Sequence, residues 1–465
     1  MSDLSDISGA APDLSRLPEG MASWVEAATG GRLAGLQPTV GAGVSREGCY
    51  LTLERDGRRI DAYLAYDVRR VDDVARQDFS RREAAALRLA EVHGLRVPHV
   101  LASWPERLAI LTRRVEGDVR FDDLDDDRKL RLAEDYIGEI AKLHRIDVAG
   151  RELDGFGPPG PPEAYALDRI TFLRRRHALH GAKDPLLVLA YKWLEMRVPR
   201  GELPTVVVHG DVGPANFLHD GERVTAVLDW EQAHYGDPME DFGWLMLRSA
   251  LFPFVPPKVL LAAYARAGGH PIDLERIRYY RVLCETGSLT DMCTQLAQLT
   301  TPFAGHLGHV YAYYFALRKL LVEALAESEA VVVPPIELPG RAVESWDRLY
   351  DLAQAEIENI VIPRSADMVG AARARSLIRL VRYWQGRERY GAAFDEAETW
   401  EIDEALGTRH ASLADARAAL VRAIETDAVP LADAIRVSSR RVARDIAMAR
   451  TGLGDLADSR WPALS

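Results

Sequence analysis

The sequence predicts an α+β protein with more than one domain. Short apolar or β-branched runs bounded by glycine-containing turns occur in the first 115 residues and again within residues 205–229. Apolar residues at helical spacing dominate the remainder, as in the stripe formed by Leu132, Tyr136, Ile140 and Leu143. A chain of 465 residues exceeds the usual size of a single core, so we expect two or three domains.

The composition excludes several classes of protein. A formal charge of −12 and a pI near 5.6 argue against a nucleic-acid partner. No run approaches the roughly 18 apolar residues that a membrane span requires. The first residues, MSDLSDISGAAPDLS, lack the basic segment and apolar core of a signal peptide, so we expect a cytoplasmic protein. Three cysteines match neither a disulfide framework nor a zinc spacing.

The first 115 residues predict a small β-rich unit. After a helix around 21–28, residues 36–53 read as a hairpin, and its Gly43 and Ser45 would allow close approach to phosphate groups. Residues 60–66 predict the next strand, and residues 80–92 predict a helix that carries Glu83. A further short strand, 108–111, ends at the sequence TRRVEG.

The most informative stretch is 205–241. A β-branched strand delivers His209, Gly210 and Asp211 to its C-terminal end, and a hairpin turning at Asp220-Gly221 ends at Asp229. The hairpin folds back, so Asp211, Asn216 and Asp229 can converge. Two carboxylates and a carboxamide are hard oxygen ligands, which suit Mg²⁺ and phosphate chemistry better than zinc.

The ordered set His209-Gly210-Asp211, Asn216, Asp229-Trp230-Glu231 and Asp241 resembles the aminoglycoside phosphotransferase and choline kinase-like family, of the acyl-CoA dehydrogenase-associated type. Asp211 as a turn cap and Asp229 as a strand end is the alternative, but independent caps would not reproduce this order and spacing. The resemblance implies a bilobal protein-kinase-like fold. Its N-lobe would span 17–114 and its helical C-lobe 115–330.

The resemblance also implies a reaction, the transfer of the γ-phosphoryl group of ATP to a hydroxyl. Asp211 would accept or orient the hydroxyl proton, and Asn216 and Asp229 would hold Mg²⁺. His209 would orient the loop, and Asp241 would brace it through backbone hydrogen bonds.

On the nucleotide side, the resemblance implies a basic residue on the third strand, paired with Glu83. The stretch DAYLAYDVRR has Ala65 or Tyr66 at that position, so we expect Arg69, or next Arg70, to supply the charge. A solvated surface pair with a neighbouring arginine is the alternative for Glu83.

The adenine would hydrogen-bond to the backbone between residues 111 and 115, near Thr112 and Arg114. The acidic stretch at 121–127, FDDLDDD, either complements a helix dipole or contacts a cationic substrate. We expect His144 to be structural, and the helical residues 242–329 to wall the acceptor pocket.

The proline-rich segment 331–340 predicts a domain boundary, and residues 341–465 predict an all-α domain of four or five helices. The predicted helices span residues 341–362, 368–385, 392–406, 413–425 and 432–447. Ser412 with Asp415 predicts a capping box, and Pro430 predicts a helix start. This tail resembles a domain of unknown function attached to, or encoded beside, such phosphotransferases; a bundle for oligomerisation or partner binding is the neutral interpretation.

Three functions follow from these patterns. The first is a small-molecule kinase acting on a hydroxyl, with a hydroxyacyl-CoA or related metabolite as acceptor. The second is an antibiotic phosphotransferase of the aminoglycoside type. The third is a pseudokinase-like nucleotide-binding or scaffold protein, suggested by the missing strand lysine and the additional helical bundle.

Overall fold

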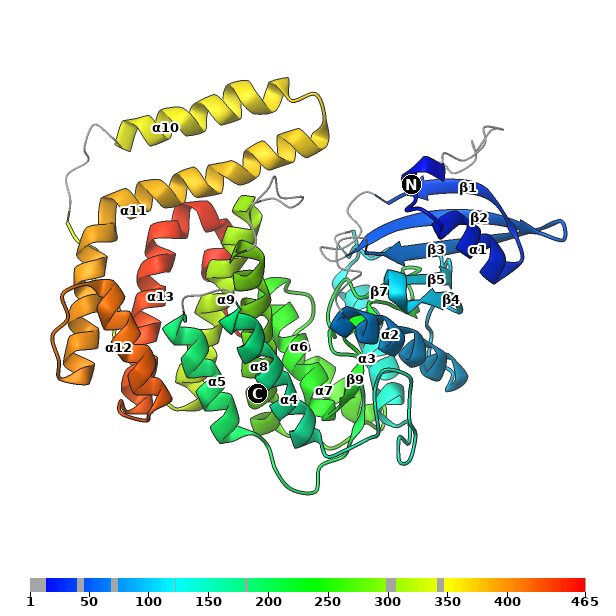
Figure 1. The fold of residues 1–465 in the computed structure, drawn as a ribbon, viewed down its shortest axis with the longest axis horizontal. Helices are drawn as coiled ribbons and strands as arrows, with labels where there is room; N and C mark the ends of the chain where they lie inside the picture. The colour runs from blue at the N-terminus through cyan, green and yellow to red at the C-terminus, as the bar shows by residue number, and fades with distance from the viewer. Residues whose placement is uncertain are drawn as a thin grey trace.

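The computed structural model describes residues 14–39, 46–67, 74–121, 123–179, 183–297, 307–340 and 347–464. Within them the predicted bilobal architecture is confirmed: a small lobe built on a β-sheet packs beside a larger helical lobe, and further helices lie on the far side of the latter (Figure 1). Among the residues that the structure describes, no helix is both long and apolar enough to cross a membrane.

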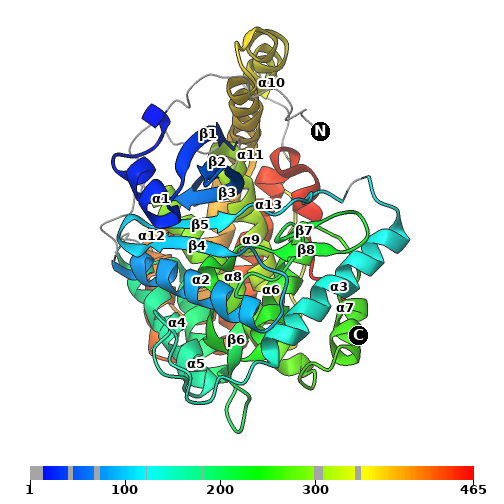
Figure 2. The same ribbon diagram turned by 90° about the vertical axis from the view of Figure 1, so that its right-hand side faces the viewer.

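The N-lobe is a five-stranded antiparallel sheet with helices on both faces (Figure 2). The strand order is β1-β2-β3-β5-β4. The elements are α1 (Met21–Thr29), β1 (Arg32–Pro38), β2 (Glu47–Arg55), β3 (Arg58–Tyr66), α2 (Val74–Val92), β4 (Val100–Trp104) and β5 (Ala109–Arg113).

Alternation along the strands explains how the sheet is covered. On β3, Leu64 and Tyr66 join the cluster that α1 covers, whereas Ala65 joins the cluster on the α2 side. The hairpin between β2 and β3 turns at Asp56-Gly57, where both residues have positive φ, as the tight turn requires. Helices α1 and α2 therefore pack on opposite faces of the sheet.

The C-lobe surrounds two short β-ribbons with helices. Four of its helices, α4 to α7, have proline in their first turn, which is compatible with the fixed φ of proline. The helices are α3 (Asp126–His144), α4 (Pro162–Ala178), α5 (Pro185–Arg197), α6 (Pro238–Leu251), α7 (Pro257–Arg266), α8 (Leu274–Ala297) and α9 (Leu307–Ser328). The ribbons pair β6 (Val206–Val208) with β9 (His234–Gly236) and β7 (Phe217–His219) with β8 (Val224–Val227).

The C-terminal segment contains α10 (Asp347–Glu356), α11 (Met368–Leu406), α12 (Leu413–Glu425) and α13 (Leu431–Leu453). The Ser412 side chain accepts a hydrogen bond from the Asp415 amide and caps α12, as predicted. Short 3₁₀ and π turns complete the chain: η1 (Leu14–Arg16), η2 (Pro105–Arg107), η3 (Trp230–Gln232), η4 (Ile357–Val361), η5 (Ile362–Arg364) and η6 (Gly454–Asp458).

The prediction of separate helices at 368–385 and 392–406 is wrong, because α11 runs unbroken through both. Gly386 lies inside it, where a Cβ atom would come within 2.1 Å of the Met448 carbonyl oxygen on α13. Gly386 allows α11 and α13 to cross closely, and this packing offsets the low helix propensity of glycine.

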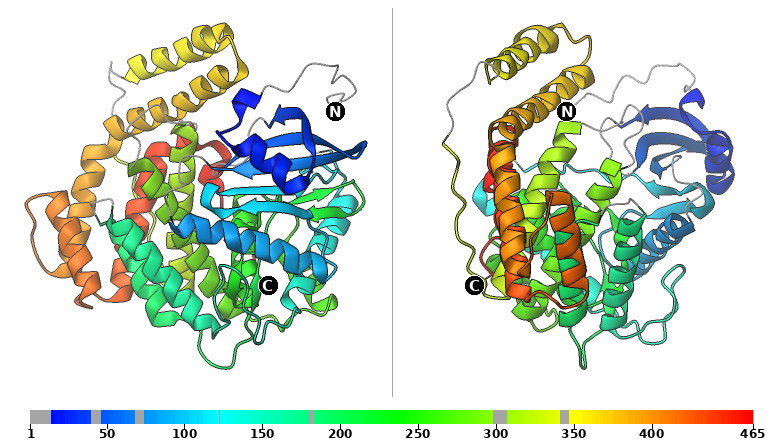
Figure 3. Two further views of the ribbon diagram at one scale, coloured as in Figure 1. Left: turned by 45° about the vertical axis from the view of Figure 1, so that its right-hand side comes forward. Right: turned by 60° about the vertical axis from the view of Figure 1, so that its left-hand side comes forward.

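The tail completes the core of the C-lobe. One continuous buried cluster includes Leu320 and Leu321 of α9 together with Leu420 of α12 and Ile435 of α13. The Trp461 indole also donates a hydrogen bond to the Leu320 carbonyl at 2.7 Å. Figure 3 shows α12 and α13 lying along the C-lobe, whereas α10 and the start of α11 project away from it. Segment 331–340 has no regular secondary structure, yet the helices beyond it do not build a separate core.

A buried arginine of the C-lobe, Arg318, interacts with carboxylates of both the lobe and the tail. The Arg318 side chain on α9 is fully buried and donates to Asp184, the N-cap residue of α5, at 2.6 Å. Its Nε atom lies 3.8 Å from Asp445 on α13. Removal of the guanidinium would leave two buried carboxylates with less compensating charge, and that is costly.

We therefore expect Arg318→Ala to lower the free energy of unfolding by about 3–5 kcal/mol. Arg266→Ala is the matched control, because Arg266 pairs with Glu134 at the surface and such pairs contribute about 0–1 kcal/mol. Urea unfolding followed by circular dichroism measures both changes. Equal shifts in the two variants would contradict a supporting role for the buried pair.

Candidate active site

The loop after β6 is held by His209, whose side chain is fully buried. Its Nε2–H donates to the Leu228 carbonyl at 2.7 Å, and its Nδ1 accepts the Asp211 amide proton at 3.3 Å. These two bonds require the neutral Nε2–H tautomer and occupy both ring nitrogens. The ring also packs edge-on against Trp230, with centroids 4.8 Å apart. His209 therefore positions the loop and has no ring nitrogen left for proton transfer.

The Asp241 carboxylate lies beneath the same loop. Its Oδ2 accepts from the His209 amide at 2.9 Å, and its Oδ1 accepts from the Gly210 amide at 2.8 Å. His144 adds a hydrogen bond to Oδ2 at 2.9 Å, and the other ring nitrogen of His144 contacts the Tyr264 hydroxyl at 2.8 Å. His144 thus has the structural location that we expected.

Burial alone would raise the pKa of the Asp241 carboxyl. The hydrogen bond and charge of His144, together with the His209 amide, outweigh burial and lower this pKa. Gly210 is required in the loop, because its φ is +79° and a Cβ atom there would lie 2.5 Å from the Gln232 carbonyl oxygen.

Asp211 is oriented by two partners. The Arg248 guanidinium of α6 donates from Nε to Oδ1 at 2.8 Å and from Nη2 to Oδ2. The Asn216 amide donates to the Asp211 carbonyl at 2.7 Å and to Oδ2 at 2.9 Å. Sequence reasoning missed Arg248. The only signal was Gly213, whose missing side chain lets the Arg248 stem pass.

Asp229 begins the turn after β8 with φ of +65°, a left-handed conformation that Asp tolerates better than most residues. Its side chain keeps 43% of its surface accessible. Partial burial by the surrounding protein, and then the nearby Asp211 charge, raise the pKa of Asp229. The Asn216 amide nitrogen donates hydrogen bonds to Asp211, so the amide oxygen of Asn216 faces away from these bonds. This oxygen accepts no hydrogen bond from the described residues. Asn216 and Asp229 therefore offer hard oxygen donors suited to Mg²⁺.

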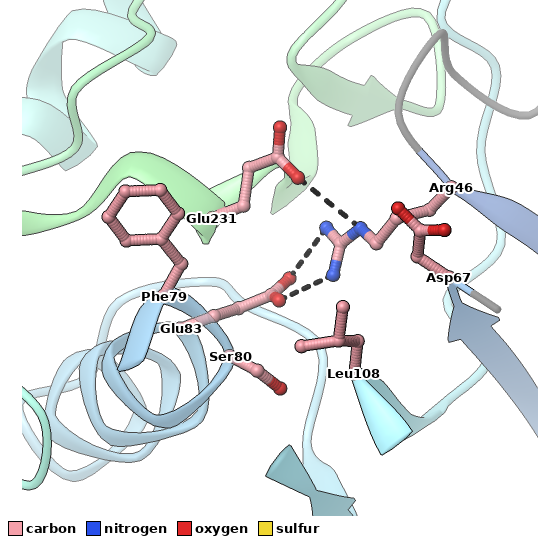
Figure 4. A pocket seen from close by; sticks show the side chains of 7 residues that line it. All are labelled: Arg46, Asp67, Phe79, Ser80, Glu83, Leu108 and Glu231. Carbon is pink, nitrogen blue, oxygen red and sulfur yellow. Dashed lines mark hydrogen bonds and ion pairs between the residues drawn. The ribbon is translucent and has the colours of Figure 1, made fainter. Parts of the chain in front are cut away.

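A pocket between the sheet and α2 contains a second arginine, Arg46 (Figure 4). Its Nη1 and Nη2 atoms donate to the two Glu83 oxygens at 2.5 and 3.0 Å. Its Nε lies 3.4 Å from Glu231, and its Nη2 lies 4.0 Å from Asp229. The pocket is lined by Arg46, Asp67, Phe79, Ser80, Glu83, Leu108 and Glu231.

Glu83 is buried at 5% exposure, so its interpretation as part of a solvated surface pair is wrong. Its partner is Arg46, at the start of β2. The sequence had suggested Arg69 or Arg70, which lie outside the described residues, as do Gly43 and Ser45. Sequence reasoning overlooked Arg46 because it searched the third strand and the loop beyond it.

Thr112 and Arg114 lie where β5 leaves the sheet for the C-lobe. The Thr112 hydroxyl donates to the Tyr63 carbonyl at 3.5 Å. The Arg114 guanidinium lies 4.5 Å from the Tyr50 ring centroid, and the Arg114 amide donates to the Asp61 carbonyl at 3.0 Å. Their contact with a nucleotide stays a prediction.

In the acidic stretch before α3, Asp125 has a structural role as the N-cap of the helix. The Asp125 side chain accepts from the Arg128 amide at 2.8 Å and caps the helix. Asp126 and Asp127 follow in the first turn, where negative charge complements the helix dipole.

Residues 39–280, more than half of the 465, match the model of the phosphotransferase enzyme family known as APH. The chain belongs to this family. The match includes every site residue from Arg46 to Arg248. The chain is therefore a kinase-type phosphotransferase for small molecules, and the family alone does not specify the acceptor.

Among curated proteins, the chain is similar to acyl-CoA dehydrogenase family member 10 of Mus musculus, with 31% identity over 111 residues, covering 23% of this chain and 10% of that protein. It is also similar to member 11 of Homo sapiens, with 27% identity over 147 residues, covering 30% and 18%. The chain thus spans less than a fifth of either relative.

Solved structures similar to the chain include a macrolide 2′-phosphotransferase from Brachybacterium faecium, with 23% identity, a TM-score of 0.39, and coverage of 62% of this chain and 100% of that one. Another is a thermostable mutant of the aminoglycoside phosphotransferase APH(4)-Ia, in complex with ADP and hygromycin B. It has 17% identity, a TM-score of 0.42, and coverage of 60% and 95%.

The lowered pKa of Asp241 predicts how stability depends on pH. A carboxyl whose pKa is lower in the folded state stabilises the protein above its ordinary pKa of about 4, and this contribution is lost as the pH falls through the folded-state value. We expect Asp241→Asn to destabilise the protein at pH 7 by about 1–3 kcal/mol, and the difference from wild type to shrink as the pH is lowered from 5 toward 3.

Urea midpoints measured across this pH range test the expectation. Asp56→Asn serves as the control, because the Asp56 side chain is 88% exposed in the β2–β3 turn. A difference between wild type and Asp241→Asn that stays constant with pH would contradict the proposed charge interaction.

Proposed function

We propose that the protein transfers the γ-phosphoryl group of ATP to a hydroxyl group of a small molecule. The observation that carries the proposal is the loop in which Asp211 is oriented by Arg248 and Asn216, beside the oxygen donors of Asn216 and Asp229. Membership of the phosphotransferase family supports this chemistry independently.

Asp211 is the residue that we propose to receive the hydroxyl proton. The acceptor oxygen attacks the γ-phosphorus, the bond from that phosphorus to the β–γ bridging oxygen breaks, and ADP leaves with the bond electrons. The proton passes to an Asp211 oxygen. Oδ2 accepts hydrogen bonds from both Arg248 and Asn216, whereas Oδ1 accepts one from Arg248 alone. Oδ1 therefore has a lone pair for the proton, and Asp211 can accept it without losing its orientation.

Asn216 and Asp229 would hold Mg²⁺. When bound, the metal ion supplies positive charge that offsets the charge developing on the phosphoryl oxygens. The charge of Asp211 and burial both disfavour an ionised Asp229, as its raised pKa reflects. A divalent cation at this position would relieve that repulsion. His209 and Asp241 contribute by holding the Asp211 backbone, so we assign them positioning roles.

For the acceptor, we propose a hydroxyacyl-CoA or a related hydroxylated metabolite. The support is the sequence similarity to acyl-CoA dehydrogenase family members 10 and 11. An aminoglycoside acceptor had been suggested by the acidic stretch at 121–127, but helix capping by Asp125 accounts for one of those acids. A screen of ADP release with hydroxyacyl-CoAs, free hydroxy acids and aminoglycosides distinguishes the classes.

We expect Asp211→Asn to fold normally and to lose acceptor-dependent ADP formation by a factor of about 10²–10⁴, because the amide cannot take the proton. ATP binding should persist. A coupled assay for ADP and a thermal-shift measurement with ATP and Mg²⁺ provide the two readouts.

The matched control is Asp455→Asn, an exposed change in the tail that should keep wild-type turnover. Wild-type turnover in Asp211→Asn would contradict the assignment. If ATP with Mg²⁺ does not stabilise the wild type, the scaffold function is favoured.

A further inference from the structure

We propose that Arg46 is the cation that binds the α- and β-phosphates of the nucleotide. Arg46 immediately precedes β2, whereas the family resemblance places this basic residue on β3. This inference rests on the proposed function. It assigns a residue to replace the lysine or arginine that β3 lacks.

Strand β3 has no basic residue at its C-terminal end that could bind the phosphates. From Ile60 to Asp67 the sequence contains no lysine or arginine. Ala65 lies in the core on the α2 side, and Tyr66 lies in the core on the α1 side. Asp67, the next residue, lines the pocket and is acidic.

The register of the sheet explains how Arg46, next to β2, can replace a basic residue at the end of β3. Glu47 pairs with Tyr66 across the two antiparallel strands, so Arg46 lies opposite the residue that follows β3. The start of β2 and the end of β3 therefore reach the same edge of the sheet. The guanidinium of Arg46, the residue immediately before β2, can therefore take the place of a basic side chain from β3, and it pairs with Glu83 on α2 (Figure 4).

The geometry leaves Arg46 with donors to spare. A guanidinium has five N–H groups. The end-on pairing with Glu83 uses one N–H on each Nη atom, and Nε faces Glu231 at 3.4 Å. The second N–H on each Nη atom is not used by Glu83, and the Asp229 carboxylate lies 4.0 Å from Nη2. These two N–H groups can bind phosphate oxygens while Glu83 keeps the side chain in place.

The position also connects Arg46 to the rest of the site. It lies between Glu83 on α2 and Asp229, a proposed metal ligand, so its charge is next to the place where the phosphates and Mg²⁺ would meet. Its side chain is only 18% exposed, which strengthens a charge interaction with phosphate relative to one at the surface. A purely structural arginine would need Glu83 alone, whereas Arg46 faces three carboxylates on two lobes.

The test is calorimetric titration of ATP, ADP and adenosine, in the presence of Mg²⁺, into wild type, Arg46→Gln and Arg32→Gln. We expect Arg46→Gln to weaken ATP and ADP binding by about 10- to 100-fold and to leave adenosine binding within about twofold, since adenosine lacks phosphates. Arg32→Gln is the matched control, because Arg32 pairs with Glu54 at the surface of the same lobe. It should bind all three ligands as wild type does.

Two further variants separate phosphate binding from a structural role. Arg46→Lys keeps the charge and should bind ATP more tightly than Arg46→Gln. Adding Asp67→Lys to Arg46→Gln places a cation at the end of β3, within the same pocket, and should recover ATP affinity by about tenfold. Melting temperatures without ligand check that each variant is folded.

Unchanged or tighter ATP binding by folded Arg46→Gln would overturn the inference and leave the proposed function standing. Equal weakening of ATP and adenosine would also overturn it, because that result indicates a distorted lobe. If the wild type binds neither ATP nor adenosine, the proposed function itself fails, and the role of Arg46 fails with it.

Discussion

The buried Asp241 carboxylate is the interaction on which the site depends. It accepts the backbone amides of His209 and Gly210, and His144 supports it from α3. One side chain at the start of α6 therefore sets the conformation of the loop that presents Asp211. Gly210 has a positive φ and no space for a side chain, so only glycine fits this position of the loop. Arg248 and Asn216 then orient the Asp211 carboxylate through hydrogen bonds.

Around that loop, acidic and basic side chains are divided between two tasks. Asp211 faces Arg248 on α6, whereas Glu83 and Glu231 face Arg46. Asp229 lies between the two groups. The charge of Asp211 raises the pKa of Asp229, whereas the charge of Arg46 lowers it. Two arginines thus offset the mutual repulsion of several neighbouring carboxylates.

The tail changes how the C-lobe is understood. Glycines allow its helices to approach closely, as at Gly386 against α13 and at Gly308 of α9 against Ser376 of α11. Arg318 joins the lobe to the tail through buried carboxylates. The lobe that would wall the acceptor pocket is therefore stabilised by residues more than a hundred positions later in the chain.

The sequence alone determined the elements that depend on local order: the strand alternation, the helix cap at Ser412, and the motif from His209 to Asp241. These follow from spacing and from backbone chemistry within a few residues. Only the tertiary structure decided which cation meets Glu83, that Arg248 holds Asp211, and that α11 is continuous. Each of these pairs residues that are 37 or more positions apart, or tests a glycine against a neighbouring helix. Such contacts depend on how strands register and helices cross, and no local pattern in the chain encodes them.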